Sequence, residues 1–178
     1  MKPFRKNVAI AIDGGGIRGI IPARALAMLE EKLGQSAHDM FRLTAGTSTG
    51  SIIAAGIAAG MSADQIYRLY LKLGEEIFHP SFRTVFWPFF NHRYLQEPLE
   101  RALRGALKDL KLGDLWEAAP RTDLVVTSFD VIENRTRFLK PWKAEYSDWP
   151  LVKAVLASAA APTYFTSVDG RFIDGGVG

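Results

Sequence analysis

Three glycine-rich turns constrain the fold of this chain more than any other feature of its sequence. They lie at residues 13–19, 46–50 and 174–176. The first follows Val-Ala-Ile-Ala-Ile at residues 8–12, a continuous apolar run typical of a strand buried on both faces. In open α/β sheets, sites form at the carboxyl ends of the parallel strands. The three turns therefore predict a functional site at one edge of a parallel sheet.

Apolar strands alternate with helices along the chain. This alternation predicts βαβ units and a mostly parallel sheet covered by helices on both faces, which is an α/β fold. Neither a repeat nor a low-complexity linker divides the sequence, so residues 1–178 are expected to form one domain. We expect helices at 22–33, 51–59, 62–73, 98–110 and 150–161, and strands at 8–12, 41–45, 124–129, 135–139, 164–168 and 171–173.

Composition excludes several classes of protein. The chain has no cysteine, which excludes a disulfide scaffold, a thiolate metal site and a cysteine nucleophile. Its 22 Lys and Arg against 19 Asp and Glu include no basic block, so nucleic acid is not expected as a partner. The longest small-apolar stretch, residues 51–61, falls well short of the ~20 residues of a membrane span, and no secretory signal is visible. We therefore expect a cytoplasmic protein that contacts membranes at most peripherally and transiently.

The first turn reads Asp13-Gly-Gly-Gly-Ile-Arg-Gly19, between an apolar strand and a helix. Backbone N–H groups at such a turn are unpaired, and glycine lets a ligand oxygen approach them closely. The positive end of the helix favours an anion, either a phosphate or the oxyanion of a tetrahedral intermediate. The spacing is not that of a P-loop, because no Gly-Lys-Ser/Thr follows. Taken alone, the segment also fits a simple tight turn.

The second turn, Gly46-Thr-Ser48-Thr-Gly50, is a Gly-x-Ser-x-Gly motif between an expected strand and an expected helix. This is the context of a nucleophile elbow, in which flanking glycines permit a sharp turn that holds the serine hydroxyl clear of its own backbone. The helix that follows is built from small residues, which allows close packing of helix on sheet. The motif predicts that Ser48 is a nucleophile.

A serine nucleophile needs a base, and the third turn supplies a candidate. The chain has only His38, His79 and His92, and none follows residue 92, which disfavours the Ser…Asp…His order of α/β hydrolases. At the end of the last expected strand, where the histidine of that order would lie, the chain has Asp174. This aspartate follows an apolar run and precedes two glycines. A carboxylate is a weak base toward a hydroxyl, so an oxyanion hole would have to carry much of the transition-state charge.

Together and in this order, the motifs resemble the patatin-like phospholipase family. The resemblance rests on the glycine loop at 13–19, the Gly-x-Ser-x-Gly elbow at 46–50, the Asp-Gly-Gly motif at 174–176, and the Ala-Ser-Ala-Ala-Ala-Pro block at 157–162. It implies a three-layer α/β/α sandwich with a mostly parallel central sheet. It also implies hydrolysis of acyl esters of membrane phospholipids or other acyl lipids, with neither metal nor cofactor.

The resemblance assigns roles to individual residues. It implies a Ser–Asp dyad of Ser48 and Asp174, with the glycine loop as the oxyanion hole. Arg18 would support that loop, although it also fits a helix-start residue paired with a nearby carboxylate. The implied roles are nucleophile for Ser48, base for Asp174, oxyanion hole for Gly14, Gly15 and Gly16, loop support for Arg18, and nucleophile elbow for Gly46 and Gly50.

Residues 78–92 are dense in aromatic side chains and contain two prolines. This composition is typical of a lid or interfacial patch that contacts lipid, and equally of a loop folded back on the core. The candidate contact residues for substrate or membrane are Phe82, Arg83, Phe86, Trp87, Phe89 and Phe90.

Two other functions fit the same sequence. One is a non-catalytic module that binds a phosphate or lipid headgroup through its glycine turns, and the other is a small-molecule esterase with a Ser-His-Asp triad.

The sequence places Asp174 four residues from its end. Chain ends are usually poorly ordered, whereas a catalytic base must be held rigidly. This position predicts that residues 1–178 are a catalytic domain truncated at its C-terminal end.

Overall fold

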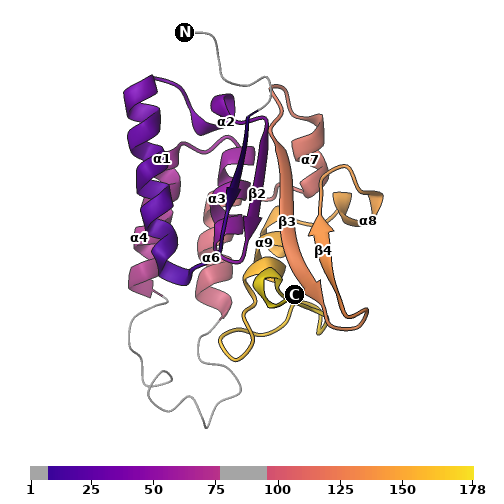
Figure 1. Cartoon of the computed structure of the whole chain (residues 1–178). Coiled ribbons are helices and arrows are strands. Elements are labelled where there is room, and N and C mark those ends of the chain that lie inside the picture. The colour runs from indigo at the N-terminus through magenta and orange to yellow at the C-terminus, as the bar shows by residue number, and fades with distance from the viewer. Residues whose placement is uncertain (1–7, 77–95) are drawn as a thin grey trace.

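A computed structural model describes residues 8–76 and 96–178, which form an α/β domain (Figure 1). Its five-stranded sheet has the order β1–β2–β3–β4, and β5 also pairs with β3. The strands are Ala9–Ile12 (β1), Leu43–Thr47 (β2), Asp123–Asp130 (β3), Arg135–Leu139 (β4) and Phe172–Asp174 (β5). The helices are Gly16–Gly19 (η2), Ile20–Leu33 (α1), Ala37–Met40 (α2), Gly50–Ala58 (α3), Ala63–Glu76 (α4), Gln96–Leu107 (α6), Leu112–Glu117 (α7), Ala144–Ser147 (α8), Leu151–Ala159 (α9) and Gly175–Val177 (η4).

The register of β3 determines where the carboxyl ends of the strands meet. β1, β2 and β3 run parallel, and β2 ends where Thr47 pairs with Thr127. From Ser128 to Asp130, β3 pairs with β4 along one edge and with β5 along the other, both antiparallel. β5 therefore occupies the edge of β3 that β2 leaves, and Asp174, the partner of Ser128, lies directly beyond the end of β2.

Helices α3 and α9 pack against one face of the sheet and lie behind it in Figure 1. All nine residues of α3 are buried, because their small and β-branched side chains let the helix approach the strands closely. On the opposite face of the sheet, Ala11 and Phe138 are exposed. None of the helices within the described ranges is both long and apolar enough to cross a bilayer.

The expected α/β class is confirmed as a mixed five-stranded sheet flanked by helices, with three strands in parallel. One predicted strand, residues 164–168, is wrong, because only Val168 makes a bridge, to Phe172. Asp169 and Gly170 have φ angles of 54° and 63°, so the chain reverses direction between the two bridged residues. The start of the segment is itself part of a turn, in which the N–H groups of Tyr164 and Phe165 donate to the Ala161 carbonyl at 3.1 and 3.0 Å, so no extended strand begins there.

Asp130, at the end of β3, fixes the start of β5 through an ion-pair network. Its side chain is fully buried, and it accepts hydrogen bonds from Arg171 Nε and Nη2 at 3.0 and 2.6 Å. Arg137 Nε on β4 donates to the same carboxylate at 3.1 Å. The Arg171 guanidinium holds the pKa of the Asp130 carboxyl well below its usual range. A buried charge of this kind is tolerated because it is paired and hydrogen-bonded.

This network predicts an acid-sensitive stability. A carboxyl whose pKa is lowered in the folded state stabilises the fold above its unfolded-state pKa, and the contribution is lost as the pH falls below that value. We expect the wild-type free energy of unfolding to fall between about pH 5 and about pH 2 more steeply than that of Asp130→Asn. Denaturant titrations at several pH values measure this. The exposed substitution Asp109→Asn is the control, and parallel profiles for wild type and Asp130→Asn would contradict the prediction.

Gly50, the first residue of α3, lies against the end of β1. A Cβ atom at this position would lie under 3.0 Å from the backbone carbonyl oxygens of Ile12 and Asp13, which cannot move without breaking the strand. We expect Gly50→Ala to lower the free energy of unfolding by about 1–3 kcal/mol, the usual cost of overpacking. A Cβ atom at Gly105 in α6 would have no atom within 4 Å, so Gly105→Ala should raise the free energy of unfolding by about 0.5–1 kcal/mol. Equal effects of the two variants in urea titrations would refute this interpretation.

Candidate active site

Ser48 lies in the sharp turn between β2 and α3. Its φ angle of 53° is in the left-handed region, which non-glycine residues rarely adopt and which marks strained backbone at functional sites. The turn is held on both sides of the serine: the Ser48 N–H donates to Ser158 Oγ on α9 at 2.9 Å, and the Ser48 carbonyl accepts from Ser51 Oγ at 2.6 Å. A sharp strand-to-helix turn of this kind is what a nucleophile elbow requires.

A buried tyrosine supports the same turn from the side of α4. The Tyr70 hydroxyl donates to the carbonyl oxygen of Thr49, and its ring lies where a Cβ of Gly19 would be. Burial raises the pKa of the Tyr70 phenol above its usual range, so the group remains a hydrogen-bond donor. The Thr49 hydroxyl in turn accepts the Gly15 N–H at 3.3 Å. Tyr70 and Thr49 therefore connect the elbow to the glycine loop.

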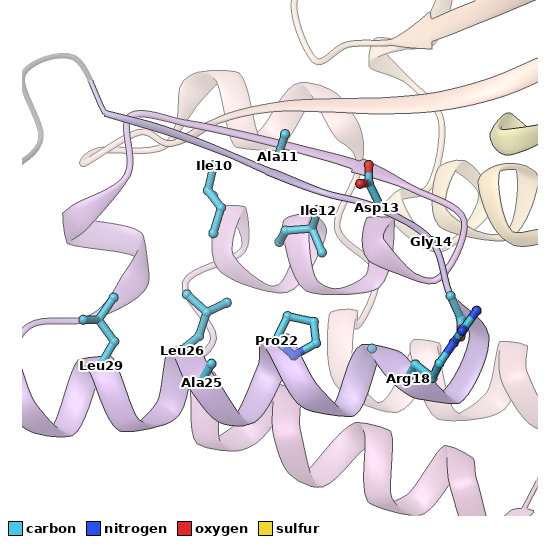
Figure 2. Close-up of a pocket in the computed structure, with 12 residues that line it drawn as sticks. Ile10, Ala11, Ile12, Asp13, Gly14, Arg18, Pro22, Ala25, Leu26 and Leu29 are labelled. Carbon is cyan, nitrogen blue, oxygen red and sulfur yellow. The ribbon is translucent and has the colours of Figure 1, made fainter.

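The glycine loop passes directly over Ser48. A Cβ at Gly14 would lie 2.6 Å from Ser48 Cβ and 3.2 Å from Ser48 Oγ, so only glycine fits. Arg18, in the one-turn helix that follows, folds back over the loop and donates from Nε to the Gly15 carbonyl at 3.3 Å (Figure 2). The backbone of the loop is thereby held within van der Waals distance of the serine.

Asp174 ends β5 and is 6% exposed. One carboxylate oxygen, Oδ1, accepts the N–H of Gly176 at 2.8 Å, which caps the short helix η4. Its own N–H donates to the Ala160 carbonyl at 3.0 Å, just beyond the end of α9. In the part of the chain that the structure describes, no hydrogen bond occupies the other carboxylate oxygen, Oδ2.

One cavity of about 540 Å³ brings the three glycine turns together. It receives residues from the ends of β1, β2 and β5, as the register of β3 requires. Its lining comprises Asp13, Gly14, Thr47, Ser48, Ala161, Asp174, Gly175, Gly176 and Val177.

A second hollow adjoins the glycine loop but contains neither Ser48 nor Asp174 in its lining. It is a mostly apolar groove of about 550 Å³ between the free edge of β1 and helix α1. Figure 2 shows Ile10, Leu26 and Leu29 along it and Arg18 at its end.

His38 does not line the cavity that contains Ser48 and Asp174. Its Nδ1 is 2.9 Å from the carbonyl oxygen of Ile57 in the last turn of α3, whereas Ser48 precedes the first turn. At 1.5 Å per residue, the seven residues from Gly50 to Ile57 separate them by roughly 10 Å along the helix. His79 and His92, and the aromatic candidates Phe82, Arg83, Phe86, Trp87, Phe89 and Phe90, lie outside the described residues.

The structure adds Tyr70, Thr49 and Ser158 to the residues that sequence reasoning selected. Ser158 had one visible signal, since it is the only hydroxyl in the run of alanines at residues 157–161. Tyr70 had none, because a tyrosine on the buried side of an amphipathic helix is ordinary core. Among the described residues, no group of three or more potential metal ligands is present.

The fold and the turn at Ser48 define the class: an α/β protein in which a serine at a strained strand–helix turn and a buried aspartate line the same cavity. A model of the patatin-like phospholipase family matches residues 10–178. The chain is 32% identical to patatin-17 of Solanum cardiophyllum over 175 residues, which cover 88% of the chain and 42% of patatin-17. It is 31% identical to intracellular phospholipase A2 of Caenorhabditis elegans over 179 residues, which cover 94% of the chain and 15% of that protein.

Two bacterial structures share the fold. VipD from Legionella pneumophila superposes with a TM-score of 0.61 at 14% identity, over 94% of this chain and 46% of VipD. ExoU of Pseudomonas aeruginosa, whose structure was solved in complex with SpcU, superposes with a TM-score of 0.57 at 21% identity. The match covers 90% of this chain and 39% of the ExoU chain.

The chain therefore belongs to the patatin-like phospholipase family, a family of serine acyl hydrolases. It spans less than half the length of the curated relatives described above.

The hydroxyl of Tyr70 provides a test of how the turn is held. Tyr70→Phe keeps the ring against Gly19 and removes only the donor to the Thr49 carbonyl. We expect a loss of about 0.5–1.5 kcal/mol in the free energy of unfolding, the usual net value of one hydrogen bond. Tyr67→Phe on the same helix is the matched control, because no hydrogen bond of the elbow depends on Tyr67. A Tyr70→Phe variant as stable as Tyr67→Phe in urea titrations would show that the bond is not needed.

Proposed function

We propose that the chain hydrolyses fatty-acyl esters of lipids by a Ser–Asp dyad, with Ser48 as the nucleophile and Asp174 as the base. One observation carries the proposal: a serine in strained backbone, a buried aspartate and a glycine-rich loop line the same cavity. Nucleophile, base and oxyanion donors are the three elements that acyl transfer needs within reach of one reacting carbon.

In the acylation half, the Asp174 carboxylate takes the proton of Ser48 Oγ while Oγ attacks the ester carbonyl carbon. The carbonyl becomes an oxyanion, and the intermediate collapses when Asp174 returns the proton to the departing alcohol oxygen. In the second half, a water gives its proton to Asp174 and attacks the acyl-enzyme. Collapse of the second intermediate releases the fatty acid, and the proton returns to Ser48 Oγ. Since no group among the described residues hydrogen-bonds Oδ2 of Asp174, while Oδ1 already binds Gly176, Oδ2 is the natural proton acceptor.

The N–H groups of Gly14, Gly15 and Gly16 are the proposed donors to the oxyanion, supported by Arg18. The close approach of Gly14 to Ser48 favours this role, since the oxyanion forms beside the attacking oxygen. The Gly15 N–H donates to Thr49 Oγ1 at a long 3.3 Å in the free protein. We propose that it exchanges this weak partner for the oxyanion when substrate binds.

The substrate class follows from the family and not from the cavity. Membership of a phospholipase family, and relatives that include an intracellular phospholipase A2, favour phospholipid or another acyl lipid as substrate. The aromatic residues between 82 and 90 remain the candidates for contact with the lipid surface, and the protein would meet membranes peripherally. A histidine triad is disfavoured at His38, which is bound at the far end of α3.

Fatty-acid release from phosphatidylcholine vesicles, followed by mass spectrometry, tests the proposal. Ser48→Ala and Asp174→Asn should each lower the initial rate by roughly a thousandfold or more, because each removes a group that takes part directly in bond making or proton transfer.

Ser147→Ala and Asp148→Asn are the matched controls for these variants, and both should hydrolyse at the wild-type rate. Equal release by wild type and Ser48→Ala would refute the mechanism. Loss of activity in Ser48→Ala but not in Asp174→Asn would retain the nucleophile and exclude the dyad.

A further inference from the structure

The C-terminal turn of α9 binds the backbone of both proposed catalytic residues. Ser158 Oγ accepts the N–H of Ser48 at 2.9 Å, and the Ala160 carbonyl accepts the N–H of Asp174 at 3.0 Å. The two attachment points are two residues apart on one rigid helix end. The nucleophile and the base come from β2 and β5, which do not pair with each other.

A second hydroxyl, that of Ser128, joins the same helix end to β5. Ser128 is fully buried in β3, and its Oγ lies 2.9 Å from the Ala157 carbonyl and 2.8 Å from the Ile173 carbonyl. Ala157 precedes Ser158, and Ile173 precedes Asp174. The turn of α9 is therefore fixed to the sheet at the point where the dyad is assembled.

A serine at position 158 does not stabilise helix α9 itself. The position is completely buried, its neighbours from 157 to 161 are alanines, and alanine has the higher helix propensity. The Ser48 amide, by contrast, needs this oxygen. The amide lies between strand and helix, where neither the sheet nor the helix offers a backbone acceptor, and leaving such a half-buried N–H unpaired is costly.

We propose that Ser158 is a positioning residue that sets the place of the Ser48 hydroxyl relative to Asp174. The inference rests on the proposed dyad mechanism. Without the Ser158 oxygen, the strained turn at Ser48 loses the bond that satisfies its amide and relaxes toward an ordinary φ. The hydroxyl then moves away from both Asp174 and the glycine loop. Ser158 is not part of the cavity lining, so its loss should change the reacting geometry and leave substrate binding intact.

The test is steady-state hydrolysis of a soluble p-nitrophenyl acyl ester, measured as kcat and KM for the whole chain. Ser158→Ala should lower kcat about 10- to 100-fold, the usual effect of a small misplacement of reacting groups, and leave KM within about twofold. Ser158→Thr keeps the acceptor oxygen and should restore kcat to within about threefold of wild type. Ser158→Cys offers only a weak acceptor, so its kcat should lie between those of Ser158→Thr and Ser158→Ala.

The matched control is Thr44→Val, which removes another fully buried hydroxyl. Thr44 Oγ1 donates to the Ala54 carbonyl in the middle of α3 at 3.1 Å, away from the turn at Ser48. Thr44→Val should lose stability comparably and keep kcat, which separates positioning from general destabilisation.

Each outcome decides the inference. The inference is overturned if the kcat of Ser158→Ala equals that of Thr44→Val, or if Ser158→Ala changes KM rather than kcat. Should Ser158→Ala not fold, the order of Thr above Cys in kcat carries the test, and equal values overturn it. Equal hydrolysis by wild type and Ser48→Ala would instead remove the proposed function itself, and this inference with it. Full dependence on Ser48 with normal Ser158→Ala activity leaves the proposed function standing and rejects only the positioning role.

Discussion

The site depends on strand β3 being three residues longer than strand β2. The two strands start in register at Leu43 and Asp123, and β2 stops at Thr47 to form the elbow. β3 continues to Asp130, with β4 along its other edge, so its last three residues offer one open edge of hydrogen-bonding groups. β5 fills that edge and ends at Asp174. The serine that follows one strand and the aspartate that ends another thus line the same cavity, because the two strands end at different positions along β3.

Close backbone approach then completes the cavity. Ser48 is held in a left-handed conformation, a state that persists only when its surroundings over-determine it. Here α9, α3 and α4 each contribute a hydroxyl to the turn, from Ser158, Ser51 and Tyr70. Gly14 lets the first loop lie on the serine without a clash. The buried Asp130, paired with Arg171, fixes the start of β5, so the aspartate side of the site is held by the sheet.

What the sequence could predict was local in character. Glycine turns, apolar runs and helix stops are encoded within a few residues, and they located the sharp turn at Ser48, the strand end at Asp174 and most helices and strands. The contacts that hold the turn are not local: Ser48 and Ser158 are 110 residues apart. Periodicity cannot report such a partner, and a serine among alanines or a tyrosine on an apolar face has an ordinary core explanation. The strand expected at 164–168 is wrong because its first residues belong to a hydrogen-bonded turn after Ala161, and these contacts override the β propensity of the segment.

The central claim is that Ser48 is a nucleophile activated by its position, and covalent labelling tests it most directly. A fluorophosphonate reacts with an activated serine, and peptide mass spectrometry identifies the modified residue. The account predicts one adduct, on Ser48, with Ser51 and Ser158 unmodified although both lie within hydrogen-bond distance of the turn. An adduct on another residue, or a folded wild-type protein that is not labelled at Ser48, would contradict it.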